Sequence, residues 1–130
     1  MILNLTQHPA TAEQLAAGVV DLPAEARQWL QQALTFECTP SRAVLKTRAE
    51  AIVAFAIEHG VKQHAYEDAF GFGQVMIGGA PFFMRALEDA LAAEGLQAMY
   101  AFSRRVSVEK VVDGVIVKTT EFRHENFVLA

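Results

Sequence analysis

Three short segments of this chain carry side chains and amides suited to binding a small anion. His8 lies in Thr6-Gln7-His8-Pro9, and an imidazole titrates near neutral pH, so it can transfer a proton or hydrogen-bond a ligand. Gly78-Gly79-Ala80-Pro81 predicts a glycine turn into a helix, whose free amides favour anions. Ser103-Arg104-Arg105 offers a hydroxyl and guanidinium groups that bind phosphate or carboxylate. Together the segments favour a site for a small anionic ligand.

Each segment also has a simpler interpretation. A lone loop histidine such as His8 is often only a polar surface residue, and Thr6 and Gln7 can cap the turn or orient a ligand. The glycines can serve only the tight passage from strand to helix, without the lysine of a P-loop or the spacing of a dinucleotide motif. Alternation along a strand turns Arg104 and Arg105 to opposite faces, so only one of them can face a given cleft.

The predicted strands bring these segments to one edge of a sheet. Apolar runs predict strands at 2–5, 74–78 and 97–102, and Pro81 begins a helix that ends at Gly95. Strand, helix and strand over 74–102 are typical of a crossover between parallel neighbours. If the three strands are parallel, their carboxyl ends deliver all three segments to the edge where open α/β sheets bind ligands.

The remaining segments complete an α/β domain. Helices are predicted at 12–17, where Thr11 and Gln14 have capping-box spacing, at 23–34, and from Ser41 to Gly60. The stretch 61–73 has no periodicity and is interpreted as a loop. We therefore expect a single Rossmann-like domain over residues 1–130, with three layers and a short, mostly parallel sheet that ends in an antiparallel hairpin.

The hairpin is the clearest local pattern. Two β-branched runs, 106–112 and 115–122, flank Asp113-Gly114, a strong turn sequence. With a two-residue turn, the residue numbers of two paired positions add up to 227. This register places Glu109 opposite Lys118 and Ser103 opposite His124. A serine hydrolase built on Ser103 and His124 is a minor alternative, because no carboxylate is placed to orient the histidine.

The composition and net charge of the chain argue against several classes of protein. Eleven basic and fifteen acidic residues give a formal charge of −4, which argues against a protein that coats long nucleic acid. The longest apolar run, 51–57, is too short for a membrane helix. The single cysteine, Cys38, excludes an internal disulfide and fits a cytoplasmic protein. His59 and His64 lack companion ligands at useful spacing, so neither a metal site nor a cofactor is expected.

Three motifs carry a resemblance to a known family. They are Ile2-Leu3-Asn4-Leu5-Thr6-Gln7-His8-Pro9, Met76-Ile77-Gly78-Gly79-Ala80-Pro81 and Tyr100-Ala101-Phe102-Ser103-Arg104-Arg105. With them the chain resembles the small CRISPR-associated Rossmann-like proteins that act as ring-nuclease-like accessories of type III systems. The motifs are short and cover the two ends and the middle, roughly half of the chain.

The resemblance implies a homodimer that binds a cyclic oligoadenylate messenger across its two-fold axis and linearises it without a metal. His8, Arg104 and Arg105 would then be catalytic. The ligand contacts would come from Thr6, Gln7, Gly78, Gly79, Ala80, Ser103 and His124. The helical segment 23–60 and the long hairpin are additions to what a minimal member of that family needs. They leave open which class of ligand the protein binds and how the site closes over it. Two alternatives stay open as well: a non-catalytic nucleotide-binding sensor, and a structural module of the same fold.

Overall fold

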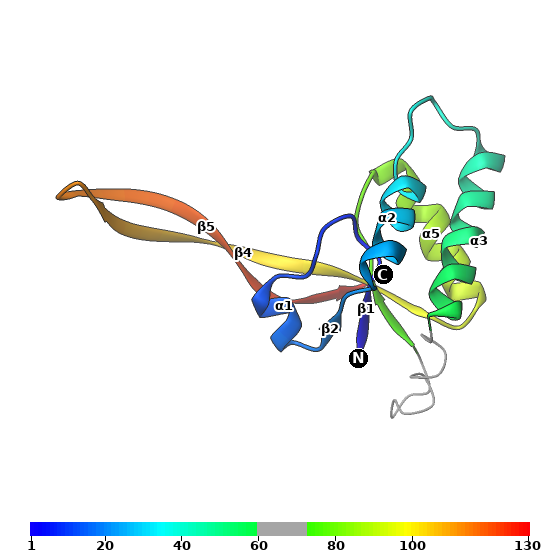
Figure 1. The fold of residues 1–130 in the computed structure, drawn as a ribbon, viewed down its shortest axis with the longest axis horizontal. Helices are drawn as coiled ribbons and strands as arrows, with labels where there is room; N and C mark the ends of the chain where they lie inside the picture. The colour runs from blue at the N-terminus through cyan, green and yellow to red at the C-terminus, as the bar shows by residue number, and fades with distance from the viewer. Residues whose placement is uncertain (60–72) are drawn as a thin grey trace.

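The computed structural model of the chain describes residues 1–59 and 73–130. It is a mixed α/β body from which one long β-hairpin projects (Figure 1). The elements in chain order are β1 (Ile2–Asn4), α1 (Ala12–Ala16), β2 (Val19–Val20), α2 (Ala24–Ala33), α3 (Arg42–Glu58), β3 (Gln74–Met76), α5 (Pro81–Ala93), β4 (Gln97–Val112) and β5 (Val115–Leu129). The predicted loop 61–73 lies almost wholly outside the described residues.

The five strands form one sheet in the order β2-β1-β3-β4-β5. The first four strands are parallel, and β5 is antiparallel to β4. The mostly parallel sheet with a carboxyl-terminal antiparallel pair is therefore confirmed. From β1 the chain moves outward to β2 and then returns to the other side of β1 as β3. The strand order thus reverses between β1 and β3.

Local sequence explains where the helices of the body begin and end. Thr11 and Gln14 form the predicted capping box of α1, and Gly18 follows it with φ of +100°. The hydroxyl of Ser41 accepts a hydrogen bond from the Val44 amide at the start of α3. Pro81 begins α5, as predicted, since its missing N–H needs no partner there.

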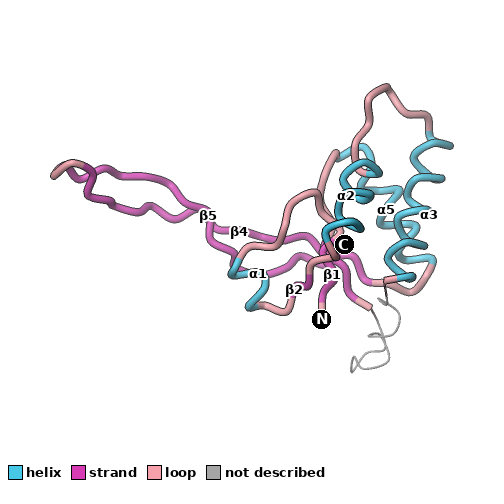
Figure 2. The backbone as a smooth tube through the Cα atoms, in the orientation of Figure 1, coloured by secondary structure: helices cyan, strands magenta, loops and turns pink. Residues whose placement is uncertain are grey.

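Helices α2, α3 and α5 cover one face of the sheet (Figure 2). Leu3 of β1 and Val75 of β3 pack there against Leu30, Ile52 and Leu87 from the three helices. The hydroxyl of Tyr100 on β4 donates to Glu88 Oε1 of α5 at 2.8 Å. This face carries the larger hydrophobic core and fixes α5 against the sheet.

The second face of the sheet holds a smaller cluster of Ile2, Val19, Met76 and Met99. Helix α1 contacts both β2 and β5, the two edge strands. In a flat sheet these strands would lie about 19 Å apart, whereas a five-residue helix is only about 7.5 Å long, so the sheet must twist and curl. No side chain of α1 is buried. Among the described residues, this face thus lacks a helical layer comparable to that of the first.

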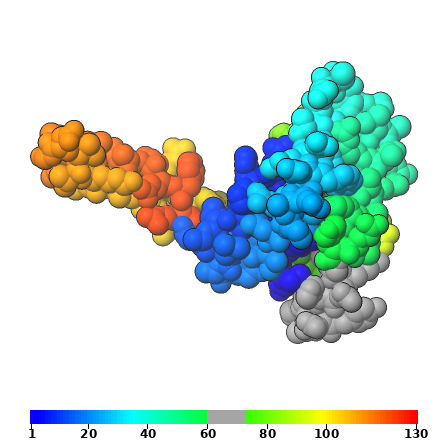
Figure 3. Space-filling model, viewed as in Figure 1, coloured from blue at the N-terminus to red at the C-terminus, as the bar shows by residue number. Residues whose placement is uncertain are grey.

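The hairpin has the predicted register. Ser103 pairs with His124, Glu109 with Lys118 and Val112 with Val115 across the Asp113-Gly114 turn, where both turn residues have positive φ. The register shifts just before Ser103, where Glu125 of β5 has no partner on β4. We call residues 103–124 the arm, because they extend beyond the body as a two-stranded ribbon (Figure 3).

Three sequence expectations need correction. The strand predicted at 97–102 continues to Val112, so Ser103-Arg104-Arg105 is part of a strand and does not form a loop at the sheet edge. Strand β2 was missed because two residues carry no periodic pattern. The apolar run 51–57 in the second half of α3 predicts burial of that half, yet Ala51 and Ala54 are exposed because only one side of the helix faces the sheet.

Candidate functional site

The loop after β1 is organised by Asn4, a buried polar side chain that is 4% exposed. Asn4 Nδ2 donates to the carbonyl oxygen of His8 and to Asp21 Oδ1, both at 2.8 Å. Asn4 Oδ1 accepts from the Thr6 amide at 2.9 Å and from the Thr6 hydroxyl at 2.7 Å. One amide group therefore holds both ends of the turn that presents His8.

Asp21, which follows β2, fixes the same loop from the neighbouring strand. Its carboxylate accepts from Asn4 Nδ2 and from the backbone amide of Ala10, at 3.0 and 3.2 Å for its two oxygens. Neither Asn4 nor Asp21 belongs to one of the three segments predicted from the sequence to form the site. The available signal was a polar residue inside an apolar strand, since such a residue needs buried partners.

The glycine turn joins β3 to α5 beside this loop. Gly79 has φ of +148°, a conformation that favours glycine. A β-carbon added at Gly78 would lie 3.6 Å from Thr6 Cγ2, so the turn and the first loop are neighbours. Within the described residues, the amides of Gly79 and Ala80 donate no hydrogen bond to the protein. These amides lie at the amino end of α5, where the helix dipole favours an anion.

The structure therefore brings two of the three predicted segments together. Strands β1 and β3 are parallel neighbours with Asn4 opposite Met76, so Thr6-Gln7-His8 and Gly78-Gly79-Ala80 leave the sheet at the same edge. This edge lies at the reversal of strand order, the position where open α/β sheets bind ligands. His8 is exposed there. We call these two segments the switch-point loops.

The arginines lie elsewhere along β4. The Ile77 amide bonds to the Met99 carbonyl, so the end of β3 is level with Met99, and Arg104 follows five residues later, about 16 Å along an extended strand. Arg104 Nη1 lies 3.9 Å from Glu125 Oε1. The Arg105 guanidinium lies over the Phe122 ring, 5.4 Å from its centroid. Among the described contacts, none joins either arginine to the switch-point loops.

Ser103 and His124 are paired across the base of the arm. The His124 ring lies 4.7 Å from that of Phe127, and its Nδ1 is buried without a hydrogen-bond partner among the described residues. No carboxylate is found bonded to this histidine in the described part of the chain. The arrangement thus lacks the acid that orients the base of a serine hydrolase.

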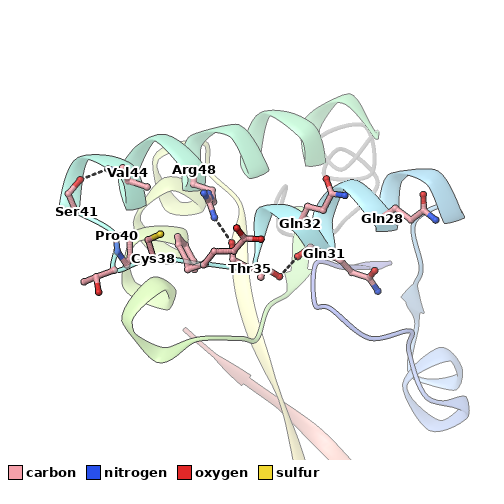
Figure 4. Close-up of a pocket in the computed structure, with 12 residues that line it drawn as sticks. Gln28, Gln31, Gln32, Thr35, Cys38, Pro40, Ser41, Val44 and Arg48 are labelled. Atoms are coloured by element: carbon pink, nitrogen blue, oxygen red, sulfur yellow. Dashed lines mark hydrogen bonds between the residues drawn. The ribbon is translucent and has the colours of Figure 1, made fainter.

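A polar hollow of about 980 Å³ opens beside the switch-point loops (Figure 4). Its walls come from the end of α2, the connection 34–41 and the start of α3. Gln31 lines it and donates from Nε2 to the Gln7 carbonyl at 3.0 Å, which joins the hollow to the first loop. Phe36 packs edge-on against Phe82 and Phe83, just after the glycine turn.

Arg48 supplies a cation at this hollow. Its Nη1 donates to the Thr35 carbonyl at 2.6 Å, and its guanidinium lies 4.4 Å from the centre of the Phe36 ring. Arg48 was not predicted from the sequence, because it lies within a long helix and belongs to no motif. Guanidinium and glutamine amide groups, as found here, suit phosphate oxygens and nucleobase edges.

The described residues contain neither a metal-binding cluster nor a membrane-spanning helix. No group of three or more histidine, cysteine, aspartate or glutamate side chains is placed to hold a metal ion within residues 1–59 and 73–130. Over the same residues, no helix is both long and apolar enough to cross a membrane.

The fold and the loops define an α/β protein with a mostly parallel sheet, whose strand order reverses beside a histidine loop and a glycine turn. The chain belongs to the family described as "Uncharacterized protein MJ1673 family", whose model matches residues 1–128. The matched residues include the arm. No curated protein and no solved structure matches the chain.

Proposed function

We propose that this protein is a cytoplasmic, Rossmann-like phosphodiesterase of the ring-nuclease kind, which binds a cyclic oligoadenylate and linearises it in type III CRISPR defence. The observation that carries the proposal is the contact between the two switch-point loops. Thr6 lies against the glycine turn, and both loops leave the sheet where its strand order reverses. The motif resemblance supplies the class of ligand.

The proposed chemistry requires positioning and charge stabilisation. The ribose 2′-hydroxyl attacks the adjacent phosphorus, a 2′-O–P bond forms and the P–O5′ bond breaks. The 2′-hydroxyl loses its proton and the leaving 5′-oxygen gains one, so the product is a linear oligoadenylate with a 2′,3′-cyclic phosphate. We assign proton transfer to His8, and phosphate binding to the amides of Gly79 and Ala80. As the resemblance implies, this reaction needs no metal.

Support for a nucleotide ligand also comes from the polar hollow. Gln31 connects the hollow to the first loop through the Gln7 carbonyl, and Arg48 places a guanidinium at its wall. A phosphate held at the glycine turn would leave the rest of a nucleotide free to extend toward these groups. Roles for Arg104 or Arg105 remain part of the proposal, and substitution of each tests them separately.

The first experiment is incubation with cyclic tetra-adenylate and cyclic hexa-adenylate in EDTA, followed by chromatography. Linear products support the phosphodiesterase. Tight binding without products would instead support the non-catalytic sensor. Binding of neither ring would leave only the structural module, because a real ligand at a hundred times its Kd stabilises the fold by about 2.7 kcal/mol.

Variants test the assigned residues. His8→Ala should lower turnover by about 10²–10⁴-fold with little change in binding, while His59→Ala, a matched exposed histidine at the end of α3, should leave both unchanged. Equal loss of turnover and affinity in His8→Ala would make His8 a ligand contact. Arg104→Ala and Arg105→Ala should differ, since alternation places them on opposite faces of the arm.

A further inference from the structure

The arm exposes large apolar side chains on both of its faces. Residues paired across an antiparallel ribbon share a face, so Val112 and Val115 lie on one face and Val111 and Ile116 on the other. Val111 is 74% exposed, Ile116 66% and Val115 62%. In the body, the apolar residues of β1 and β3 are buried, and exposed apolar side chains of the other strands, such as Phe102 and Val128, lie near the base of the arm.

The arm also lacks the support that a ribbon of this length needs. A two-stranded hairpin alone is at best marginally stable in water, and its free edges favour pairing with other chains. Its shortest ion pair, Lys110 Nζ to Glu121 Oε1 at 2.8 Å, is exposed and contributes little. The base of the arm contacts residues just outside it, where Arg104 lies near Glu125 and the His124 ring lies near Phe127. A further described contact with the body is the ion pair of Arg123 with Glu13, at 4.0 Å. The ribbon is therefore expected to pack on another surface.

Charge favours a second copy of this chain as that surface. Residues 103–124 contain five basic and three acidic side chains, whereas the rest of the chain contains six basic and twelve acidic ones. The arm and the body thus carry net charges of opposite sign, and an arm is attracted to the body of another copy. The Asp113-Gly114 tip and the apolar side chains beside it are less suited to the phosphates of a nucleic acid.

The surface area that each contact would bury distinguishes two ways of pairing: arm packed on arm, or each arm packed on the body of the other copy. The ten residue pairs from Ser103–His124 to Val112–Val115 form a ribbon about 33 Å long and about 10 Å wide, so one face covers about 330 Å². Two arms packed only on each other would bury about that area per copy, well below the roughly 800 Å² of a specific interface. Reciprocal packing of each arm on the other body doubles the area to about 660 Å² per copy, which falls at the lower end of the roughly 600–1,000 Å² per partner of specific interfaces.

We propose that the arm is the dimerisation element of this protein, and that each arm lies along the acidic body of a second copy around a two-fold axis. The homodimer expected from the family resemblance specified no interface, whereas the arm provides one. The inference does not depend on the proposed phosphodiesterase activity, and its test contains no nucleotide.

The test is sedimentation equilibrium of the full chain at low salt, with variants of the arm. The wild type should be dimeric. Val112→Thr/Val115→Thr, which keeps β-branched side chains and charge, should raise the dimer dissociation constant at least tenfold. Lys118→Glu should also weaken the dimer, while Lys118→Arg, its matched control, should not. Circular dichroism should show the same fold in every variant.

Crosslinking locates the contact. A photo-crosslinker on Val112→Cys in a Cys38→Ser background, with isotopically labelled and unlabelled chains mixed, should join residue 112 to residues 1–97 of the other copy. A wild type that remains monomeric even when the protein is concentrated to about millimolar would overturn the inference. So would an unchanged dimer in the arm variants, crosslinks confined to arm and arm, or a monomer whose arm binds RNA or lipid vesicles instead.

Discussion

The body and the arm are built from the same kinds of residue, yet they obtain stability in different ways. In the body, short strands of three residues are covered by helices, and Leu3, Val75 and Leu87 are at most 3% exposed. In the arm, ten strand pairs have no covering layer among the described residues, and valines and an isoleucine face solvent. The comparison shows that a strong local hairpin sequence specifies geometry without supplying a core.

The largest expected difference concerns side-chain truncation. Leu87→Ala, at a fully buried position of α5, should lower the free energy of unfolding by about 3 kcal/mol because it leaves a cavity. Val111→Ala at the tip of the arm should change it by less than about 0.5 kcal/mol in dilute solution. Urea unfolding at low protein concentration measures both. Similar losses from the two variants would show that the arm is buried within its own chain.

The next effect concerns polar groups. Asn4→Leu should cost about 2–3 kcal/mol because the Thr6 amide and the Asp21 carboxylate lose their buried partner. Asn126→Leu, an exposed asparagine near the base of the arm, is the matched control and should have little effect. Thermal unfolding checks the pair. A neutral Asn4→Leu would mean that water or rearrangement replaces the network that holds the first loop.

A smaller effect is expected at the glycine turn. Gly79→Ala should destabilise the protein by about 1–2 kcal/mol, since its φ of +148° strains any other residue. Gly78→Ala should be nearly neutral, because its added carbon meets Thr6 only at ordinary contact distance. Denaturant midpoints distinguish the two. If Gly78→Ala were the more harmful variant, the space between the switch-point loops would be tighter than described.

The smallest effects concern two pKa shifts, and these have opposite directions: the pKa of Tyr100 in the body is raised, and that of Glu121 on the arm is lowered. Burial, followed by the hydrogen bond to Glu88, raises the pKa of Tyr100 to about 12. The stabilisation linked to this group is therefore present below pH 10 and is lost as the pH rises toward 12. Absorbance titration of wild type against Tyr100→Phe isolates its ionisation. Glu88→Gln should lower this pKa only in part, because burial remains.

On the arm, the hydrogen bond from Lys110 lowers the pKa of the Glu121 carboxyl below its ordinary 4.5, with a smaller contribution from Arg123. Stabilisation linked to this group is present above pH 4.5 and is lost as the pH falls through the lowered pKa. Carbon NMR titration should show the Glu121 midpoint returning toward 4.5 in Lys110→Met. An unchanged midpoint would assign the shift to other groups.

Local rules explain what the sequence predicted well. The Asp113-Gly114 turn sets the hairpin register because both turn residues need positive φ. Pro81 and the glycines before it mark the passage from β3 to α5. The position of the switch-point loops at one edge followed from parallel pairing, since parallel strands end on the same side.

Tertiary features were harder to predict. The continuation of β4 past Phe102 was missed because the arm has no buried face, so charged residues such as Arg104 and Arg105 occur inside the strand without a period-two pattern. The Asn4–Asp21 bond joins residues seventeen positions apart, and no local rule pairs them. Arg48 reaches the polar hollow only through the packing of α3 on α2, which brings its guanidinium to the Thr35 carbonyl.

The most direct test of the contrast between body and arm is amide hydrogen exchange measured over a range of protein concentrations. The body core, including Leu87 and Val75, should show protection that is independent of concentration, because it depends on contacts within one chain. The amides of residues 103–124 should exchange rapidly in dilute protein and become protected as dimers form. Arm amides that are equally protected at every concentration would contradict the account, because the arm would then be stable without a second copy.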